Sequence, residues 1–300
     1  MRSLVSRLAR FTRLHEMSLL AALHAAFLVG LGFLYLNDNF EHHVFARIAV
    51  HATKGAKAQR DSVLELLHAT STLVRARSDL LAPLPAEHRV LKEEFLESAD
   101  AYLLGSNACG SYAIVLARLM QEIDRPVRVG QMRCDAHWGC HIFVEAQVDG
   151  RWAVLDPTYD LHFSAPDGHL ASAAELSANW AAYAHQVPPG YDRRYKYDGF
   201  RYTNWNKIPV IMPAMHRALL ALGMDGVEQF SARVELLSLY RGYARAALIP
   251  YLFICVLTLR KFVRRRRRRL ANRGPGVSLP PGAGIASRIT RESPSTARRD

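Results

Sequence analysis

Cysteine is scarce in this sequence, with four among 300 residues. This scarcity excludes a small domain held together by many disulfides. The central part also lacks an excess of basic charge, since residues 38–243 carry 21 Lys and Arg against 24 Asp and Glu. The formal net charge of +12 therefore belongs to the two ends, which argues against a nucleic-acid-binding domain in the middle. Half of the residues are hydrophobic, which excludes a mainly disordered chain.

Long apolar runs are few, but two are present. The first, residues 17–36, contains no Asp, Glu, Lys or Arg. As a helix it covers about 30 Å, the thickness of a bilayer core. The arginine-rich residues 1–16 precede it, and no small-residue cleavage site follows Leu36. We therefore predict a transmembrane helix rather than a secretory signal peptide or a buried core helix.

The second apolar run, residues 246–259, is shorter and contains Pro250. A basic cluster follows it directly, at Arg260, Lys261 and Arg264–Arg269. Such a cluster beside an apolar segment is typical of a membrane anchor that also contacts anionic lipid. We predict a second transmembrane helix here, and no nucleic-acid site.

The basic flanks of the two runs also predict the orientation of the chain. Because cytoplasmic flanks are enriched in Lys and Arg, we expect residues 1–16 and 260–300 in the cytoplasm. Residues 38–243 then lie in a periplasmic or extracellular space, attached to an inner or plasma membrane. The tail within 260–300 is rich in Gly, Pro, Ser and Arg and is expected to be disordered. The alternative has one span, with residues 246–259 in a core helix and the tail outside.

Apolar periodicity divides the outer segment into helices followed by strands. Helices are predicted at residues 57–81, 86–104, 108–123, 170–184 and 213–240. Strands are predicted at residues 127–132, 141–148 and 151–155, with turns at 135–139 and 149–150. Residues 186–207 are irregular and rich in aromatic side chains. This order predicts an α+β domain in which a helix packs on an antiparallel sheet.

Three residues of this segment have the chemistry of a catalytic triad. Cys109 lies at the start of a predicted helix, where free backbone N–H groups and the helix dipole favour a thiolate. His141 begins the middle strand and Asp156 ends the next one, so both can lie on one face of an antiparallel pair. A Cys nucleophile, a His base and an Asp that orients the His form an arrangement used for acyl transfer.

Four short motifs carry a resemblance to a known family. They are Asn107–Ala113 opening a helix, Arg128–Gly130, His141–Glu145 and Trp152–Thr158. In this order and spacing they resemble the transglutaminase-like superfamily of papain-type enzymes, over about residues 57–165. The resemblance implies a papain-like core, in which the nucleophile helix packs on an antiparallel sheet. Flanking helices and a transmembrane helix at each end would complete the fold.

The resemblance also implies roles for individual residues. Cys109 would be the nucleophile, His141 the general base and acid, and Asp156 the orienting residue. The backbone N–H of Gly110 and the side chain of Asn107 would hold the oxyanion. Gly110 stands where calcium-dependent animal transglutaminases have a Trp, and compact bacterial members of this kind resemble peptidases or amidases. This chemistry needs no metal and no cofactor.

Two further cysteines, Cys134 and Cys140, flank the expected turn at 135–139. They are candidates for a disulfide, since cross-strand positions are close enough for one and an exported domain permits oxidation. The alternatives are two free thiols, or a zinc site formed with His137 and His141. The compact spacing of those four residues argues against zinc, as does the catalytic use of His141.

Two other groups of residues leave alternatives open. His42, His43 and His51 follow the first apolar run and are expected to be solvated rather than to bind a metal. The aromatic segment 191–205 either lines a groove for a glycan or peptide or packs on the domain, and packing is favoured.

Together these features predict a membrane-anchored cysteine hydrolase or acyltransferase that acts on amide bonds through a thioester. Its substrate would be a protein or peptide of the cell envelope. The alternative is a catalytically inactive, membrane-tethered interaction module of an envelope or polysaccharide assembly.

Overall fold

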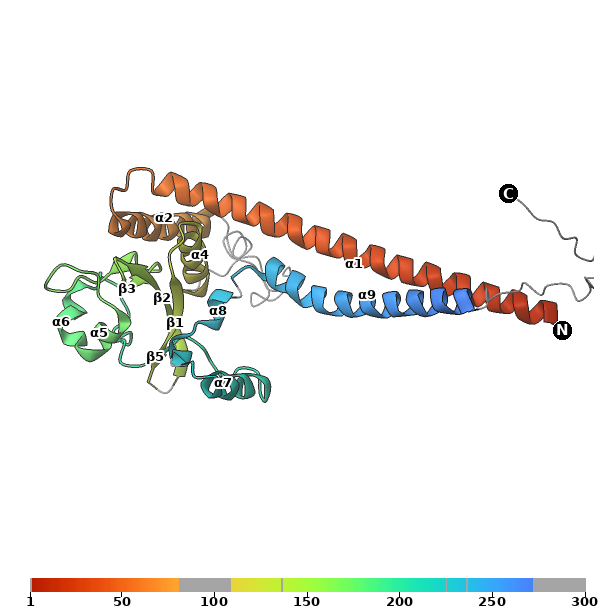
Figure 1. The fold of residues 1–300 in the computed structure, drawn as a ribbon. Helices are drawn as coiled ribbons and strands as arrows, with labels where there is room; N and C mark the ends of the chain where they lie inside the picture. Colours follow the sequence, from red (N-terminus) through yellow and green to blue (C-terminus); the bar gives the residue numbers. More distant parts are fainter. Residues whose placement is uncertain (1, 81–108, 136, 225, 236, 272–300) are drawn as a thin grey trace, which may run out of the picture. The chain divides into compact units, whose positions relative to one another are not determined.

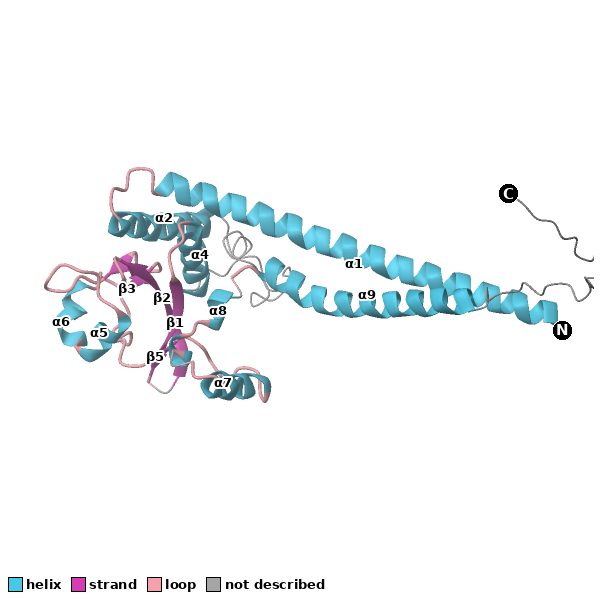
Figure 2. Ribbon diagram, in the orientation of Figure 1, coloured by secondary structure: helices cyan, strands magenta, loops and turns pink. Residues whose placement is uncertain are grey.

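The computed structural model describes residues 2–80, 109–135, 137–224, 226–235 and 237–271 (Figure 1). The helix predicted at 86–104, Asn107 and residues 272–300 of the tail lie outside these ranges. The chain divides into two compact units, residues 1–250 and 251–300. The first unit contains a five-stranded antiparallel sheet with helices packed on it, which confirms the predicted α+β class (Figure 2).

The first helix, α1 (Arg2–Ala52), contains the first apolar run and continues well beyond its end at Leu36. The predicted boundary at residue 36 is therefore not a helix end. The reason is tertiary: Glu41, Phe45 and Ala49 are spaced four apart, lie on one face of the helix and are buried. Phe45 and Ala49 join the core formed with α4 (Cys109–Glu122). The chain from Glu16 to Ala52 is long and apolar enough to cross a membrane.

The last described helix, α9 (Leu239–Ala271), contains the second apolar run and Pro250. The stretch Leu239–Arg268 also meets the length and apolarity needed to cross a membrane. Residues 260–271 are helical, which corrects the expectation that a disordered tail begins at residue 260. At its start α9 is tied to α1, because Arg241 Nη2 donates to Asp38 Oδ2 at 3.2 Å.

The helices predicted at 57–81 and 108–123 are confirmed as α2 (Gln59–Leu80) and α4. Their apolar faces and the face of α1 form the larger core on one side of the sheet, with buried residues that include Phe45, Val63, Leu66, Leu67, Leu116 and Leu119. Figure 1 shows α2 and α4 on this side. The start of α4, which carries Cys109, is thereby held at one end of the sheet.

The sheet has the strand order β4-β3-β2-β1-β5, and every neighbouring pair is antiparallel. Its centre is the predicted meander of β1 (Val127–Cys134), β2 (His137–Val148) and β3 (Arg151–Asp156). The turn between β2 and β3 has positive φ at both of its residues, 49° at Asp149 and 82° at Gly150. These angles match the right-handed twist of the flanking strands.

Two features of the sheet differ from the sequence prediction. β2 begins at His137 rather than at His141, so the turn expected over 135–139 is shorter. The edge strands β4 (Leu161–His162) and β5 (Phe200–Arg201) were not predicted. Each has two residues, too few to show an alternating pattern, and each exists only because a longer strand offers it hydrogen bonds.

The other face of the sheet is covered by an aromatic layer. The single helix predicted at 170–184 is instead α5 (Ala173–Ala178) and α6 (Trp180–Tyr183), which are separated at Asn179. Together they enclose a second core that includes Phe143, Phe163, Tyr183, Tyr191 and Tyr197. Most of the aromatic segment 191–205 therefore packs on the domain, which was the preferred of its two predicted roles.

The continuous helix predicted over 213–240 is not formed. Its place is taken by α7 (Ile211–Ala221), α8 (Ala232–Glu235) and the start of α9. Gly223 has a φ of 76°, a left-handed conformation that ends a helix and that glycine adopts without strain.

Gly130 of β1 offers a sharp test of this packing. It lies directly opposite Phe143 of β2, and a Cβ at this position would come within 2.3 Å of the fully buried Phe143 ring. Gly130→Ala is therefore expected to destabilise the domain by about 1–3 kcal/mol, as overpacking of a core does. The measurement is denaturant unfolding of the detergent-solubilised chain. The control is Gly226→Ala, where a Cβ meets no atom within 4 Å; equal losses in both variants would refute the prediction.

Candidate active site

The register of two strands brings His141 and Asp156 together. β2 pairs with β3 so that Val144 lies opposite Leu155, which makes His141 and Asp156 diagonal neighbours on one face. The His141 Nε2 atom lies 2.6 Å from Asp156 Oδ2, and both side chains are buried. The other carboxylate oxygen accepts the backbone N–H of Thr158 at 3.1 Å. The carboxylate is thereby fixed, and it orients the imidazole ring.

Cys109 is the third residue of the candidate site, and it comes from the helical layer that packs on the sheet. It is the first residue of α4, it is half-buried, and its thiol is free. The start of α4 lies against β2, since a Cβ at Gly110 would be 3.6 Å from Ile142 Cδ1. The Cys109 thiol is close enough to the His141 ring to raise its pKa. Nε2 of His141 is bound to Asp156, so Nδ1 is the ring nitrogen without that partner.

The electrostatics of this group favour a protonated His141. Burial lowers the pKa of His141, but the charge and hydrogen bond of Asp156 and the contact with Cys109 outweigh it and raise the pKa to about 9. The ring therefore carries a proton at neutral pH. A positive ring attracts a negatively charged sulfur, the form of cysteine that attacks carbonyl groups.

The sequence did not indicate a second positive charge near the sulfur, Arg233 of α8. Burial lowers the pKa of Arg233, while the charge of Cys109 opposes this shift. Its buried Nη1 has no hydrogen-bond partner within the described part of the chain. Its helix is fixed to the sheet, because the backbone N–H of Val129 donates to Ser231 Oγ at 3.0 Å. No motif marks Arg233, since only the fold places α8 near α4.

Tyr195 covers the His141 ring and was also not singled out from the sequence. The two rings are stacked, with centroids 4.3 Å apart and planes 12° from parallel. The Tyr195 hydroxyl donates to the carbonyl oxygen of Cys140 at 3.3 Å. The half-buried tyrosine therefore restricts how the imidazole can rotate. The only signal in the sequence was the aromatic density of residues 191–205.

The predicted oxyanion donors are partly described. Gly110 lies in the first turn of α4, where backbone N–H groups have no acceptor within the helix. Its N–H, next to the sulfur of Cys109, is available to a developing negative charge on a substrate oxygen. Asn107, the other predicted donor, lies outside the described residues.

Cys134 and Cys140 are joined by a disulfide, with Cα atoms 5.9 Å apart. The bond closes the hairpin between β1 and β2 directly before His141. It uses both thiols, so the alternative zinc site with His137 is not formed. No group of three or more His, Cys, Asp and Glu side chains suited to a metal occurs among the described residues.

Two motif residues, Arg128 and Glu145, form a buried structural network beside this group. They are opposite each other in β1 and β2, and Arg128 Nε donates to Glu145 Oε2 at 2.7 Å. The Arg128 guanidinium lies between the rings of Trp152 and Tyr202, at 4.1 and 4.3 Å from their centroids. Glu145 also accepts the Tyr202 hydroxyl and, at 2.8 Å, the backbone N–H of Ala173. The network therefore joins the sheet to the start of α5.

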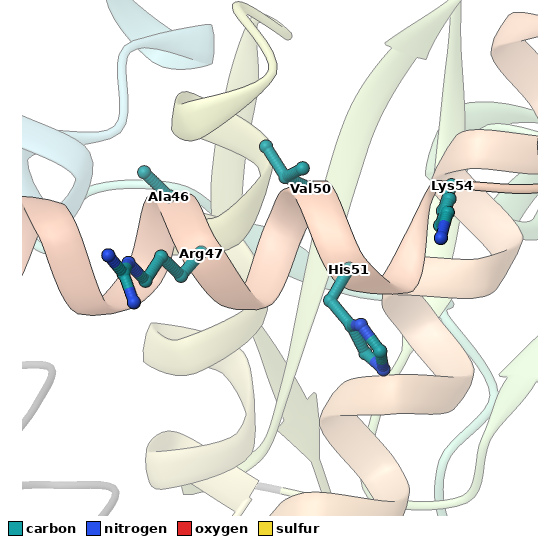
Figure 3. Close-up of a pocket in the computed structure, with 5 residues that line it drawn as sticks. All are labelled: Ala46, Arg47, Val50, His51 and Lys54. Atoms are coloured by element: carbon teal, nitrogen blue, oxygen red, sulfur yellow. The ribbon is translucent and has the colours of Figure 1, made fainter.

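A separate hollow of about 620 Å³ lies on α1 and its following turn, lined by Ala46, Arg47, Val50, His51 and Lys54 (Figure 3). Cys109, His141 and Asp156 are not among the residues that line it, and it is open to the surface. His42 is exposed, as expected, and its Nδ1 also lies 2.8 Å from Oε2 of Glu122 in α4. This contact adds to the attachment of α1 to α4.

Comparison of the chain with protein-family models, with curated proteins and with solved structures found no match. The class of the protein therefore rests on its own fold and site. It is an α+β protein with two helices suited to crossing a membrane and with a Cys109–His141–Asp156 constellation.

Proposed function

We propose that this chain is a membrane-anchored thiol hydrolase or acyltransferase with a transglutaminase-like, papain-type core. The observation that carries the proposal is the buried His141–Asp156 pair, with Cys109 at the start of α4 close enough to the ring to raise its pKa. A half-buried sulfur, a buried imidazolium and a fixed carboxylate are the three parts that acyl transfer requires. The Asn107 and Gly110 donors at the oxyanion remain part of this proposal.

The proposed reaction has two steps. In the first, the Cys109 thiolate attacks the carbonyl carbon of an amide, and the oxyanion is held by backbone N–H groups at the start of α4. His141 gives its proton to the leaving amine, the C–N bond breaks and a thioester forms. In the second step His141 takes a proton from water or from an acceptor amine. That nucleophile then attacks the thioester and releases the Cys109 thiolate.

The substrate class we propose is a protein or peptide of the cell envelope. The proposal follows from the orientation that the basic flanks indicate, with residues 38–243 outside and both termini in the cytoplasm. In this orientation the Cys134–Cys140 disulfide lies in a compartment that permits oxidation. The Arg264–Arg269 cluster lies at the cytoplasmic surface, where it contacts anionic lipid.

Selective alkylation tests the enzymatic proposal without a known substrate. Iodoacetamide at pH 7 is expected to label Cys109 at least about tenfold faster than a free cysteine peptide, because a thiolate reacts and a thiol does not. The site of modification is mapped by mass spectrometry in the oxidised chain. His141→Ala is expected to remove most of this excess rate. A Cys109 no faster than the peptide in a folded chain would favour the inactive interaction module.

Reporter fusions test the orientation. A reporter that matures only outside the cytoplasm is expected to be active when inserted after residue 150 and inactive when fused after residue 275. A cytoplasmic reporter is expected to give the reverse pattern. Activity of the external reporter at both positions would indicate one span, and a cytoplasmic signal at residue 150 would overturn the proposed compartment.

A further inference from the structure

The helix α7 presents an apolar face to solvent. Ile211, Met215 and Leu222 are 64%, 41% and 78% exposed, although each is large and apolar. Ala214 and Ala218 are exposed between them, so these five positions form one continuous sector of the helix. Within α7 the only residue with a permanent charge is Arg217, which borders this sector.

The opposite side of α7 is held by a small set of contacts. Met212 packs with Trp205 and Val227 in a cluster separate from the two cores of the sheet. His216 stacks on Trp205 at 4.8 Å between ring centroids, and its Nε2 lies 2.8 Å from Glu228 Oε1. The helix is therefore fixed in one orientation, with its apolar sector facing away from the domain.

Such a sector is unusual on a surface that faces only water. Single exposed apolar residues are common, but contiguous ones mark a surface that contacts another apolar phase. The neighbouring segment extends the sector, because Ile208 and Val210 are 49% and 79% exposed. The basic residues Lys207 and Arg217 are exposed at its border, where their charged groups can reach phosphates while their stems stay on apolar surface.

The nearest apolar phase is the bilayer that α1 and α9 are proposed to cross. Asp38, two residues beyond the first apolar run, is bound to Arg241 near the start of α9. Both helices are thus attached to the domain where they would leave the membrane. Only residues 222–238 separate α7 from α9. Within residues 2–250, α7 extends from the sheet toward the side on which the N-terminal half of α1, with its apolar run, leaves the domain (Figure 2).

We propose that the apolar face of α7 inserts into the outer leaflet of this membrane, with Lys207 and Arg217 at the lipid headgroups. This inference rests on the proposed membrane anchoring, but not on the catalytic proposal. It gives the domain a third contact with the bilayer besides α1 and α9. The orientation of the Cys109 site relative to the membrane surface is then fixed, which limits the site to substrates at a constant distance from the bilayer.

Spin labels in the full chain test the insertion. The background carries Cys109→Ala and Cys255→Ala and keeps the Cys134–Cys140 disulfide, and single labels are placed by Met215→Cys or Leu222→Cys. The measurement is made in nanodiscs that hold one chain each. It gives the ratio of spin-label collisions with oxygen to collisions with a water-soluble nickel chelate. We expect this oxygen-to-nickel ratio to be several-fold higher at positions 215 and 222 than at Arg151→Cys. Arg151 is an exposed residue of the sheet. Val29→Cys in the first apolar run supplies the value for a position inside the bilayer.

Three outcomes decide the proposal. If the oxygen-to-nickel collision ratio at positions 215 and 222 is close to that of Val29→Cys, the result supports insertion. Adding Ile211→Glu should then lower the ratio at position 215. If the helix faced water, this change would leave the ratio as it was. A ratio like that of Arg151→Cys overturns it. A water-like ratio in single-chain nanodiscs that becomes shielded at high density shows a second copy as the partner, and also overturns it. If the label at Val29→Cys itself gave the ratio of a water-exposed position, the proposed membrane anchoring would be refuted. This result would not depend on any measurement on Cys109.

Discussion

Turnover of amide substrates is expected to be abolished when Cys109 is replaced by alanine, because no other group in the site can form the thioester. His141→Ala should cost nearly as much, since the sulfur then loses both its base and the acid that protonates the leaving amine. Residues that act as one unit give losses of roughly 10³-fold or more, and the double variant should be little worse than either single one. The assay is cleavage of a peptide-amide library by the reconstituted chain. Cys255→Ala, in the second apolar run, is the matched control and should keep wild-type rates.

The proposed role of His141 also predicts how activity depends on pH. The pKa of His141 is raised to about 9, so its proton is present at neutral pH and is lost as the pH rises through about 9. Because the leaving amine needs this proton, activity should fall on the alkaline side near that value. Asp156→Asn removes the carboxylate charge that raises the pKa, while burial continues to lower it. The alkaline limb should therefore move to lower pH, with a trace of activity retained.

Two results would contradict this prediction. The first is a correctly folded Cys109→Ala variant that keeps wild-type turnover of a substrate. The second is an Asp156→Asn profile whose alkaline limb stays where it is in the wild type. Circular dichroism of each variant provides the control for folding.

The largest loss of stability is expected from Glu145→Ala. This change leaves the Arg128 guanidinium buried without its carboxylate and removes the acceptor of the Tyr202 hydroxyl and of the Ala173 N–H. Breaking a buried ion pair by removing one partner costs about 3–5 kcal/mol. The free energy of unfolding, measured by denaturant titration in detergent, should fall by this amount. Loss of the Ala173 contact should also loosen the start of α5.

Matched variants separate this effect from loss of any carboxylate. Glu228→Ala removes an exposed carboxylate that pairs with His216 and should cost less than about 1 kcal/mol. In the double variant Arg128→Met with Glu145→Leu, the unpaired buried charge is absent, so the loss should be smaller than in Glu145→Ala alone. A Glu145→Ala variant that is as stable as Glu228→Ala would show that Arg128 is solvated.

Local pattern was sufficient to predict the part of the fold that carries the site. The helical spacing of Tyr112, Leu116, Leu119 and Met120 defined α4, and the alternating strands defined the meander. A tight turn with the right residues sets the register of β2 and β3. That register is why the sequence alone places His141 and Asp156 on one face.

Local sequence pattern failed to predict element boundaries that depend on contacts with distant segments. The apolar run ends at Leu36, yet α1 continues to Ala52 because Phe45 and Ala49 are buried against α4. β5 exists only as a partner for β1. The predicted helix over 213–240 is broken because Gly223 adopts a left-handed φ, which a helical apolar pattern does not reveal.

The sequence by itself determined the α+β class, the two apolar helices, the helix that begins at Cys109 and the proximity of His141 and Asp156. These depend on periodicity, length and neighbouring residues, which act over a few positions of the chain. The tertiary structure alone placed Tyr195 on the His141 ring, Arg233 near the Cys109 sulfur and Glu145 against Arg128 and the start of α5. Those contacts join residues up to more than a hundred positions apart. They arise from the packing of layers, and periodicity shows which face of an element is buried but not which distant residue it meets.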